Sequence, residues 1–356
     1  MKKMAIFIAV GWVIFVIPSV PTDCMAGEKL QPITLKFADS IVENSWFGQQ
    51  HKWWASEVGK RTGGKVKVQI FWMESLVKWK DMLSGIQSGM ADLGWIGATY
   101  HPSNLPLNLT FTNPFNIRED YVTSILAALD TVENEPNLKA EFERENVILL
   151  GSHISGMVQL ASKKCISSLA GLKGKTLRTW GGGRAKYYEY LGANPIFMAY
   201  TDIYEAIDRG TISAFDMSWL LSNTFKHYEV VKCILMTNSG GAIGGDGIFM
   251  NLKVFRNFPQ EVQKMLLDLR KEYAERYAKN LMDIESNYLR EWETKYGVTM
   301  KYLTPEDQKI NFEAGKRAQE YFLKKQESEG HTAAPKVWNY YMNALKKYED
   351  QRARKK

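Results

Sequence analysis

The sequence predicts an α/β protein built of two lobes. The chain has 356 residues, of which 45% are hydrophobic, and this length fits two domains better than one. A strand–helix–strand pattern occurs twice, starting at "GKVKVQIF" (64–71) and at "GKTLRTW" (174–180). Two long helical patterns, Pro259–Tyr296 and Pro305–Glu329, follow both units and are expected to pack over the lobes or connect them.

The first unit contains the N-terminal elements. The segment "ITLKFADS" (33–40) reads as a strand, and the helical pattern after it closes on Gly63–Gly64. The alternating strand 64–71 leads to an amphipathic helix over 81–88. That helix stops at Gly89, a residue suited to the left-handed cap, and the chain then enters a further strand.

The second unit repeats this order after a buried strand at 146–154. Its helix begins at Asp202, which has Glu205 three positions later as in a capping box, and stops at Gly210. We expect the chain to cross between lobes near 150–155. It would return through the glycine-rich stretch near 239–247.

These crossings divide the chain into two expected lobes. Lobe 1 comprises residues 31–150 and 240–285, and lobe 2 comprises residues 151–239 and 286–356. Each lobe is expected to hold a sheet of about five strands.

The N-terminus is typical of a secretory signal peptide. Lys2 and Lys3 precede an apolar run from Met4 to Ile17, and "CMA" provides a small residue at the cut position before Gly27. The run is too short for a comfortable membrane span. We therefore expect residues 1–26 to be a signal peptide and the mature protein to be exported; a retained anchor is the alternative.

Composition excludes several function classes. The formal charge of +7 is spread along the chain, and the only dense basic group is the terminal "RARKK", so no nucleic-acid partner is expected. The histidines do not recur at metal-ligand spacing, and the chain has no Gly-x-Ser-x-Gly elbow, Walker lysine loop or C-x-x-C. We expect no metal, no cofactor and no enzymatic activity, with the histidines on the surface or in satisfied polar roles.

Two cysteines remain after export, Cys165 and Cys233. They can pair in an oxidising compartment, but two cysteines in a chain of this length are not a disulfide scaffold. The sequence favours unpaired thiols and leaves a single disulfide as the alternative.

A series of motifs resembles a known family over about residues 30–320. In order, these are "KFADS", "KRTGGKVKVQIFW", "MLSGIQSGMADLGWIG", "NPF", "GLKGKTLRTW", "YLGANPIFMAYTDIYEAIDRGTISA" and "NTFKHYEVVKCILMTN". The chain resembles the DctP-type receptors of tripartite ATP-independent periplasmic (TRAP) transporters. The resemblance implies a two-lobed periplasmic-binding-protein fold (type II-like) with a hinge, and a long helix near 259–295 that spans both lobes. It also implies a periplasmic receptor that hands an organic acid to membrane permease subunits; a binding module of another importer or sensor, or a secreted enzyme, is the alternative.

Arg178 is the first candidate for ligand binding. In the family, the arginine that ends the "GKTLR" strand contacts the ligand carboxylate, and Arg178 occupies that position. A guanidinium offers a planar fork of donors that matches a carboxylate. The alternative is that Arg178 pairs with a protein carboxylate or lies on a solvated face.

Departures from the family pattern point to the ligand's body. Many relatives carry a second arginine just after the central strand, where this chain has Val158. They also often carry an asparagine where this chain reads "FDMSWLL", with Met217 and Trp219. A second carboxylate or a polyol loses its expected partners, so we expect a monocarboxylate with an apolar or aromatic body.

Tryptophans at strand ends are the remaining candidates, since ligands of α/β proteins bind where strands end. Core packing is the alternative for each of them. The set is Trp46, Trp72, Trp95, Trp180 and Trp219. Possible polar contacts are Glu43, Asn44 and Glu74, and Asp216 is expected to bind a cation or to hold Arg178.

Overall fold

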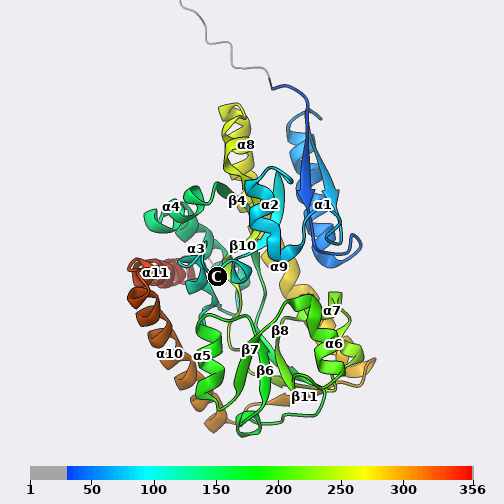
Figure 1. Ribbon diagram of the computed structural model, residues 1–356, viewed down its shortest axis with the longest axis vertical. Coiled ribbons are helices and arrows are strands. Elements are labelled where there is room, and N and C mark those ends of the chain that lie inside the picture. Colours follow the sequence, from blue (N-terminus) through cyan, green and yellow to red (C-terminus); the bar gives the residue numbers. More distant parts are fainter. Residues whose placement is uncertain (1–29, 355–356) are drawn as a thin grey trace, which may run out of the picture.

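Two sheets form the centres of two lobes in the computed structural model, which describes residues 30–354. Figure 1 shows one lobe above the other along the long axis of the molecule. The expected signal peptide, 1–26, lies outside the described residues. Within residues 30–354, no helix combines the length and apolar character needed to span a membrane.

The first sheet has five strands in the order β2-β1-β3-β10-β4. Strand β10 runs antiparallel to both of its neighbours, whereas β1 is parallel to β2 and to β3. Leu35 and Phe37 alternate along β1 and are fully buried, as the period of a strand requires. The strands are β1 (Ile33–Ala38), β2 (Val66–Phe71), β3 (Leu93–Gly97), β4 (Val147–Ile154) and β10 (Ile243–Asn251).

The second sheet has six strands in the order β11-β9-β5-β8-β6-β7. Strand β5 runs antiparallel to β8 and β9, and β6 is parallel to β7 and β8. The strands are β5 (Gln159–Ser162), β6 (Thr176–Thr179), β7 (Asn194–Phe197), β8 (Ala214–Met217), β9 (Cys233–Met236) and β11 (Thr299–Tyr302).

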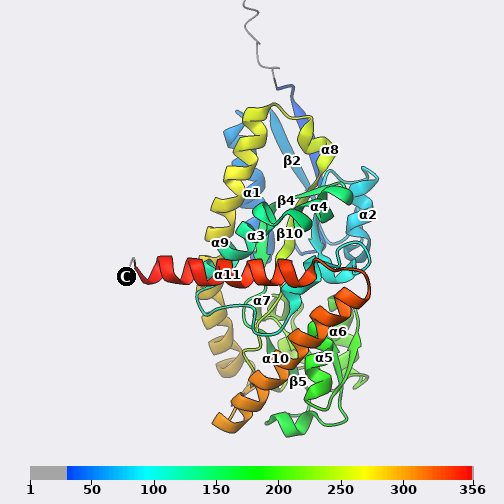
Figure 2. The same cartoon turned by 90° about the vertical axis from the view of Figure 1, so that its left-hand side faces the viewer.

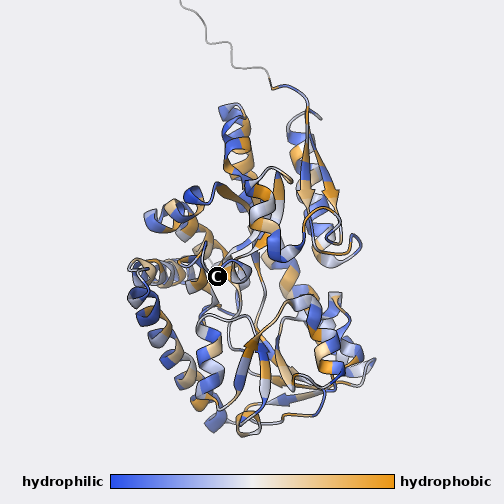
Figure 3. Cartoon of the chain, viewed as in Figure 1, coloured by the Kyte–Doolittle hydropathy of each residue, from blue (hydrophilic) through white to orange (hydrophobic). Residues whose placement is uncertain are grey.

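Helices cover the two sheets. Those at the surface carry both hydrophilic and hydrophobic residues along their length (Figure 3), as helices with one face on a core do. Their bounds are α1 (Trp46–Arg61), α2 (Met82–Gln87), α3 (Tyr121–Asn134), α4 (Pro136–Arg144), α5 (Gly183–Tyr190), α6 (Ile203–Asp208), α7 (Trp219–Thr224), α8 (Leu252–Arg256), α9 (Gln260–Thr294), α10 (Pro305–Ser328) and α11 (Ala334–Ala353).

The chain passes between the lobes four times, the last time between α10 and α11. Residues 155–158 connect β4 to β5, and residues 237–242 connect β9 to β10. The third connection is α9, which packs on β4 and α3 in the first lobe and reaches α7 in the second, where Trp292 meets Trp219 at 5.6 Å between ring centroids. Figure 2 shows α9 running along much of the molecule. These features confirm the predicted two-lobed α/β fold and its spanning helix.

Helix α11 differs from the expected division of the chain. The sequence predicts residues 286–356 in lobe 2, yet α11 packs against α3, which itself packs on β4 and β10 of the first sheet. Val337, Tyr341 and Leu345 recur every four residues and are fully buried, so this helix needs an apolar surface to cover. Helix α10, by contrast, packs on α5 in the second lobe. The other lobe boundaries stay a prediction.

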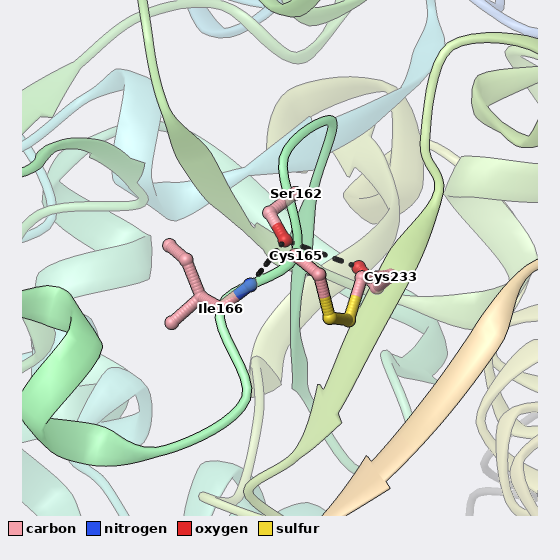
Figure 4. Close-up of a disulfide and its surroundings, with 4 residues drawn as sticks. All are labelled: Ser162, Cys165, Ile166 and Cys233. Atoms are coloured by element: carbon pink, nitrogen blue, oxygen red, sulfur yellow. Dashed lines mark hydrogen bonds between the residues drawn. A yellow bond between two sulfur atoms is a disulfide. The ribbon is translucent and has the colours of Figure 1, made fainter.

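Cys165 and Cys233 form a disulfide, which corrects the expectation of unpaired thiols. Strands β5 and β9 are antiparallel neighbours with Ser162 opposite Cys233. The chain that leaves β5 therefore brings Cys165 to the start of β9. Ser162 Oγ donates a hydrogen bond to the Cys233 carbonyl at 3.3 Å and accepts one from Ile166 N at 3.4 Å (Figure 4). The two cysteines are 68 positions apart, so only the strand pairing shows that they meet.

Candidate ligand-binding site

A small cavity, with about 40 Å³ of space that the centre of a water molecule can occupy, lies between the two lobes. Aromatic side chains make up much of its wall. The first lobe and α9 contribute Phe47, Trp79, Trp95, Gly97, Thr99, Tyr100, His153, Ile154, Asp246 and Tyr277. The second lobe and the two crossings contribute Ser155, Trp180, Tyr200, Ser218, Leu221 and Ala242.

Trp95 and Trp180 are the two predicted tryptophans that line the cavity. Trp95 lies in β3, and its Nε1 donates a hydrogen bond to Asp246 Oδ1 at 2.5 Å. Trp180 follows β6, and the guanidinium carbon of Arg184 lies 5.4 Å from its ring centroid. The cavity is therefore bounded by one predicted tryptophan from each lobe.

Arg178 lies beside the cavity in β6 and is only 1% exposed. Its Nε donates to the Met198 carbonyl at 3.1 Å, and its guanidinium carbon lies 4.9 Å from the centroid of the Tyr200 ring. Nη1 has no hydrogen-bond partner, and no carboxylate among residues 30–354 lies within ion-pair distance. Burial lowers the pKa of Arg178. Tyr200, on whose ring the guanidinium lies, lines the cavity, whereas Arg178 does not.

Asp216 pairs with Arg184 and not with Arg178. Arg184 Nε lies 2.9 Å from Asp216 Oδ2, and both side chains are fully buried. Thr179 and Tyr188 also donate to this carboxylate. Burial alone would lower the pKa of Arg184, but the charge of Asp216 raises it above its ordinary value. This arrangement corrects the expectation that Asp216 holds Arg178 or is free to bind a cation.

Val158, Met217 and Trp219 are buried in the core and do not line the cavity. Ser218, between the last two, does line it. Successive residues of an extended chain point in opposite directions, which explains why Ser218 faces the cavity when its neighbours face the core. The expected apolar contacts at these positions are thus packing contacts in this structure.

The other predicted residues lie around the first lobe and do not line the cavity. The ring of Trp46 packs on that of Tyr277 at 4.8 Å between centroids, so it supports a lining residue. Glu74 Oε1 accepts a hydrogen bond from Trp79 N at 2.9 Å, so it supports Trp79, which is a second lining residue. Trp72 is half-buried away from the cavity. Exposed positions hold Glu43 and Asn44.

Sequence reasoning missed several lining residues, and Tyr100 shows why. It follows β3 in a short 3-10 turn, a place with no repeating pattern. Its hydroxyl accepts a hydrogen bond from Tyr200 N at 3.1 Å, and its ring lies 5.9 Å from that of Phe197. Tyr100 therefore connects the lobes across the cavity. A tyrosine just after "GWIG" at a strand end was the available signal.

A buried polar chain in the first lobe reaches the cavity wall at His153. Asp39 Oδ2 lies 2.6 Å from His51 Nδ1, and His51 Nε2 lies 3.2 Å from His153 Nε2. Tyr273 OH lies 2.8 Å from the same His153 nitrogen. Burial lowers the pKa of His153 to about 4. These histidines are buried and not at the surface, and residues 30–354 hold no group of three or more metal-ligating side chains.

Comparisons with known proteins point to one family. The chain matches the bacterial extracellular solute-binding proteins, family 7, over residues 37–326. It is 24% identical over 268 residues to a 2,3-diketo-L-gulonate-binding periplasmic protein of Escherichia coli, a match that covers 74% of this chain and 79% of that one.

Solved structures agree with this match. A TRAP periplasmic solute binding protein from Desulfovibrio salexigens, an open complex, is 26% identical with a TM-score of 0.74 over 89% of this chain and 97% of that one. A marine metagenome TRAP solute binding protein specific for aromatic acid ligands, with 3-hydroxybenzoate, is 20% identical with a TM-score of 0.79 over 89% and 99%.

Proposed function

Because this chain belongs to family 7 of the bacterial extracellular solute-binding proteins, the DctP-type receptors of TRAP transporters, we propose that its ligand is an organic monocarboxylate. The ligand has an apolar or aromatic body, and the receptor delivers it to membrane permease subunits. Receptors of this family are extracytoplasmic. The proposal places the mature protein in the periplasm, in keeping with the apolar run near the N-terminus.

The observation that carries the proposal is the state of Arg178. Its guanidinium is buried, its Nη1 has no partner, and no acid among the described residues pairs with it. A buried charge without a partner is unfavourable by several kcal/mol. A ligand carboxylate would supply the missing charge and two parallel hydrogen bonds.

Opening of the lobes would give the ligand access to Arg178. Tyr100 belongs to the first lobe, whereas Tyr200 and Arg178 belong to the second. The hydrogen bond from Tyr200 N to the Tyr100 hydroxyl joins the lobes beside the guanidinium. Separation of the lobes would remove Tyr100, and a carboxylate could then occupy the space next to Arg178.

The cavity wall favours one carboxylate and a flat body. Among the described residues that line it there is no lysine or arginine, and Asp246 is the one acidic side chain. A second carboxylate would meet like charge and aromatic rings, at a penalty of several kcal/mol. Trp95, Trp180 and Tyr200 line the cavity, and aromatic side chains suit packing against a flat acid. The structural neighbour that holds 3-hydroxybenzoate is consistent with such a ligand.

Arg178→Ala tests the carboxylate contact. Removal of one partner of a buried charge pair should weaken binding of the acid by about 30- to 5000-fold, or about 2–5 kcal/mol. Arg178→Lys should bind the acid almost as weakly as Arg178→Ala does, because lysine lacks the planar fork of donors. Isothermal titration calorimetry measures the affinity. Arg209→Ala, on an exposed arginine directly after α6, is the matched control and should bind as wild type does. An Arg178→Ala variant that binds within a few-fold of wild type would contradict the proposal.

A screen of organic acids by thermal shift tests the ligand class. A ligand at ~100 times its dissociation constant should add about 2.7 kcal/mol to the free energy of unfolding. Monocarboxylates with apolar or aromatic bodies should raise the melting temperature more than four-carbon dicarboxylates or sugar acids do. If calorimetry identified a dicarboxylate as the tightest ligand, the monocarboxylate assignment would be wrong.

A further inference from the structure

We infer that the cavity contains a second polar subsite, formed by Asp246 and His153, which selects acids that carry a hydrogen-bond donor at the end opposite their carboxylate. The donor is a hydroxyl, amide N–H or ammonium group. This inference rests on the proposed function, since it assumes that Arg178 binds the carboxylate.

Asp246 is held in the cavity wall by an irregular part of strand β10. It pairs with Gly97 of β3, but the register of β10 with β4 shifts between Ile243 and Gly247. Such bulges change the direction of a side chain and are common beside functional sites. The Asp246 side chain remains 23% exposed and lines the cavity. The bulge thus presents a carboxylate to the ligand space.

Asp246 lacks a cationic partner in this structure. Trp95 Nε1 donates to its Oδ1, and within the described part of the chain no lysine or arginine nitrogen lies within 4.0 Å of it. The one imidazole nearby is His153, whose Nδ1 lies 3.6 Å from Oδ1. The remaining lone pairs of this carboxylate are available to a donor from the ligand.

The tautomer of His153 adds an acceptor beside Asp246. The 2.6 Å contact with Asp39 fixes the proton of a neutral His51 on Nδ1, so its Nε2 accepts. We assign the proton of His153 to Nε2, which faces His51 Nε2 at 3.2 Å and Tyr273 OH at 2.8 Å. This tautomer leaves a lone pair on His153 Nδ1, which is buried with no hydrogen-bond partner. Two acceptors therefore lie side by side, and each needs a donor.

The surroundings of this subsite favour a donor, including a positively charged one. Tyr277 stacks on His153 at 4.8 Å, and its hydroxyl is buried without a partner. The rings of Trp79 and Phe47 pack on Trp95 at 4.7 and 4.8 Å. Aromatic faces next to a carboxylate attract cations. A second carboxylate on the ligand would be repelled here.

The two subsites lie on different lobes. Arg178 is in the second sheet, and Asp246 is in the first. An acid with a donor at its far end would contact both lobes at once and would stabilise their closure, whereas the same acid without the donor would contact only one charged group. This difference predicts a preference that can be measured with matched pairs of ligands.

Calorimetry with matched pairs tests the subsite. The pairs are benzoate and 3-hydroxybenzoate, phenylacetate and 3-hydroxyphenylacetate, and hexanoate and 6-aminohexanoate, titrated into the wild type, Asp246→Asn and Asp283→Asn. In the wild type, the member with the donor should bind about 10- to 100-fold tighter in at least one pair, as expected for a hydrogen bond to a charged group. Asp246→Asn should reduce that preference to about threefold or less and leave the unsubstituted acid nearly unchanged.

Asp283→Asn removes the same charge from an exposed position of α9 and should keep the full preference. Should Asp246→Asn fail to fold, the wild-type pairs alone decide: no preference for a donor overturns the inference. A preference that persists in a folded Asp246→Asn variant overturns it too. The two subsites are separate if Arg178→Ala abolishes binding of every acid while Asp246→Asn still binds the unsubstituted acids. If no acid binds the wild type, the proposed function and this inference both fail.

Discussion

Arg178 and Arg184 show how much the partner of a buried charge matters. Both guanidinium groups are almost completely buried near the same end of the second sheet. Arg184 is paired with Asp216 and donates to Ser239, whereas Arg178 donates one hydrogen bond to a backbone carbonyl. The charge of Arg184 is therefore neutralised by a residue of the same chain. Arg178 has no acidic partner among residues 30–354, and we propose that the ligand carboxylate supplies one.

Substitution by methionine should separate these two roles. Arg184→Met leaves Asp216 buried without its cation, so we expect a loss of about 3–5 kcal/mol in the free energy of unfolding of the ligand-free protein. Arg178→Met removes a charge that has no acid partner among the described residues, and stability should change by less than about 1 kcal/mol or increase. Urea unfolding without ligand measures both. Equal losses in the two variants would contradict the distinction.

The sequence could identify Arg178 as a candidate but could not show that Asp216 pairs with Arg184. Arg178 stands at the end of a strand motif, and motif position is visible in the sequence. The choice of Asp216 as partner of Arg184 depends on how α5 sits over β8, which is a tertiary contact. Asp246 was missed for a similar reason, since its exposure to the cavity depends on a bulge between β10 and β4.

At the scale of elements, α9 contacts the first crossing between the lobes through Glu285. Tyr121 OH donates to Glu285 Oε2 at 2.6 Å and accepts from Met157 N at 2.9 Å. Gly156 permits this approach, because a Cβ there would lie 1.9 Å from Glu285 Oε1. Burial raises the pKa of Glu285 to about 8. The carboxyl group is therefore protonated in the folded protein at neutral pH.

This pKa predicts a loss of stability on going from pH 6.5 to pH 8. The folded pKa of Glu285 lies above its unfolded value of 4.5, so its contribution is complete below pH 4.5 and is lost as the pH rises through 8. The wild type should lose on the order of 2 kcal/mol over this range from Glu285. Glu285→Gln, which cannot ionise, should remove that part of the slope. Denaturant unfolding at pH 6.5 and pH 8 measures the free energy of unfolding. If Glu285→Gln lost as much stability between these pH values as the wild type, Glu285 would not be the group responsible.

Most periodic elements could be predicted from the sequence to within a few residues. The expected strand 33–40 is observed at 33–38, and the expected helix 259–296 is observed as α9 at 260–294. The alternation of apolar and polar residues in a strand and the glycine that ends a helix are local signals, so they can be recognised in the sequence. Pairing is not local: β10 lies between β3 and β4, and α11 packs on α3, more than 200 positions earlier. Neither arrangement is visible in a local pattern.

At the scale of the whole molecule, four connections join the lobes, and three of them are short. Residues 155–158, 237–242 and 329–333 can absorb a change of backbone angles, while α9 remains a rigid support. We therefore expect hinge closure when the ligand binds. Small-angle scattering should show a smaller radius of gyration at saturating acid, and Arg178→Ala at the same acid concentration should show none. An unchanged radius in the saturated wild type would argue against the hinge.

The insertion of β10 into the first sheet also constrains how the chain folds. The edge strand β4 meets the rest of that sheet only through β10, so the sheet is incomplete until residue 251 has been synthesised. The second sheet likewise waits for β11, which ends at Tyr302. Such long sequence separations make folding slow. Neither lobe corresponds to a continuous stretch of the gene, so fragments cut at the crossings should stay unfolded when expressed alone.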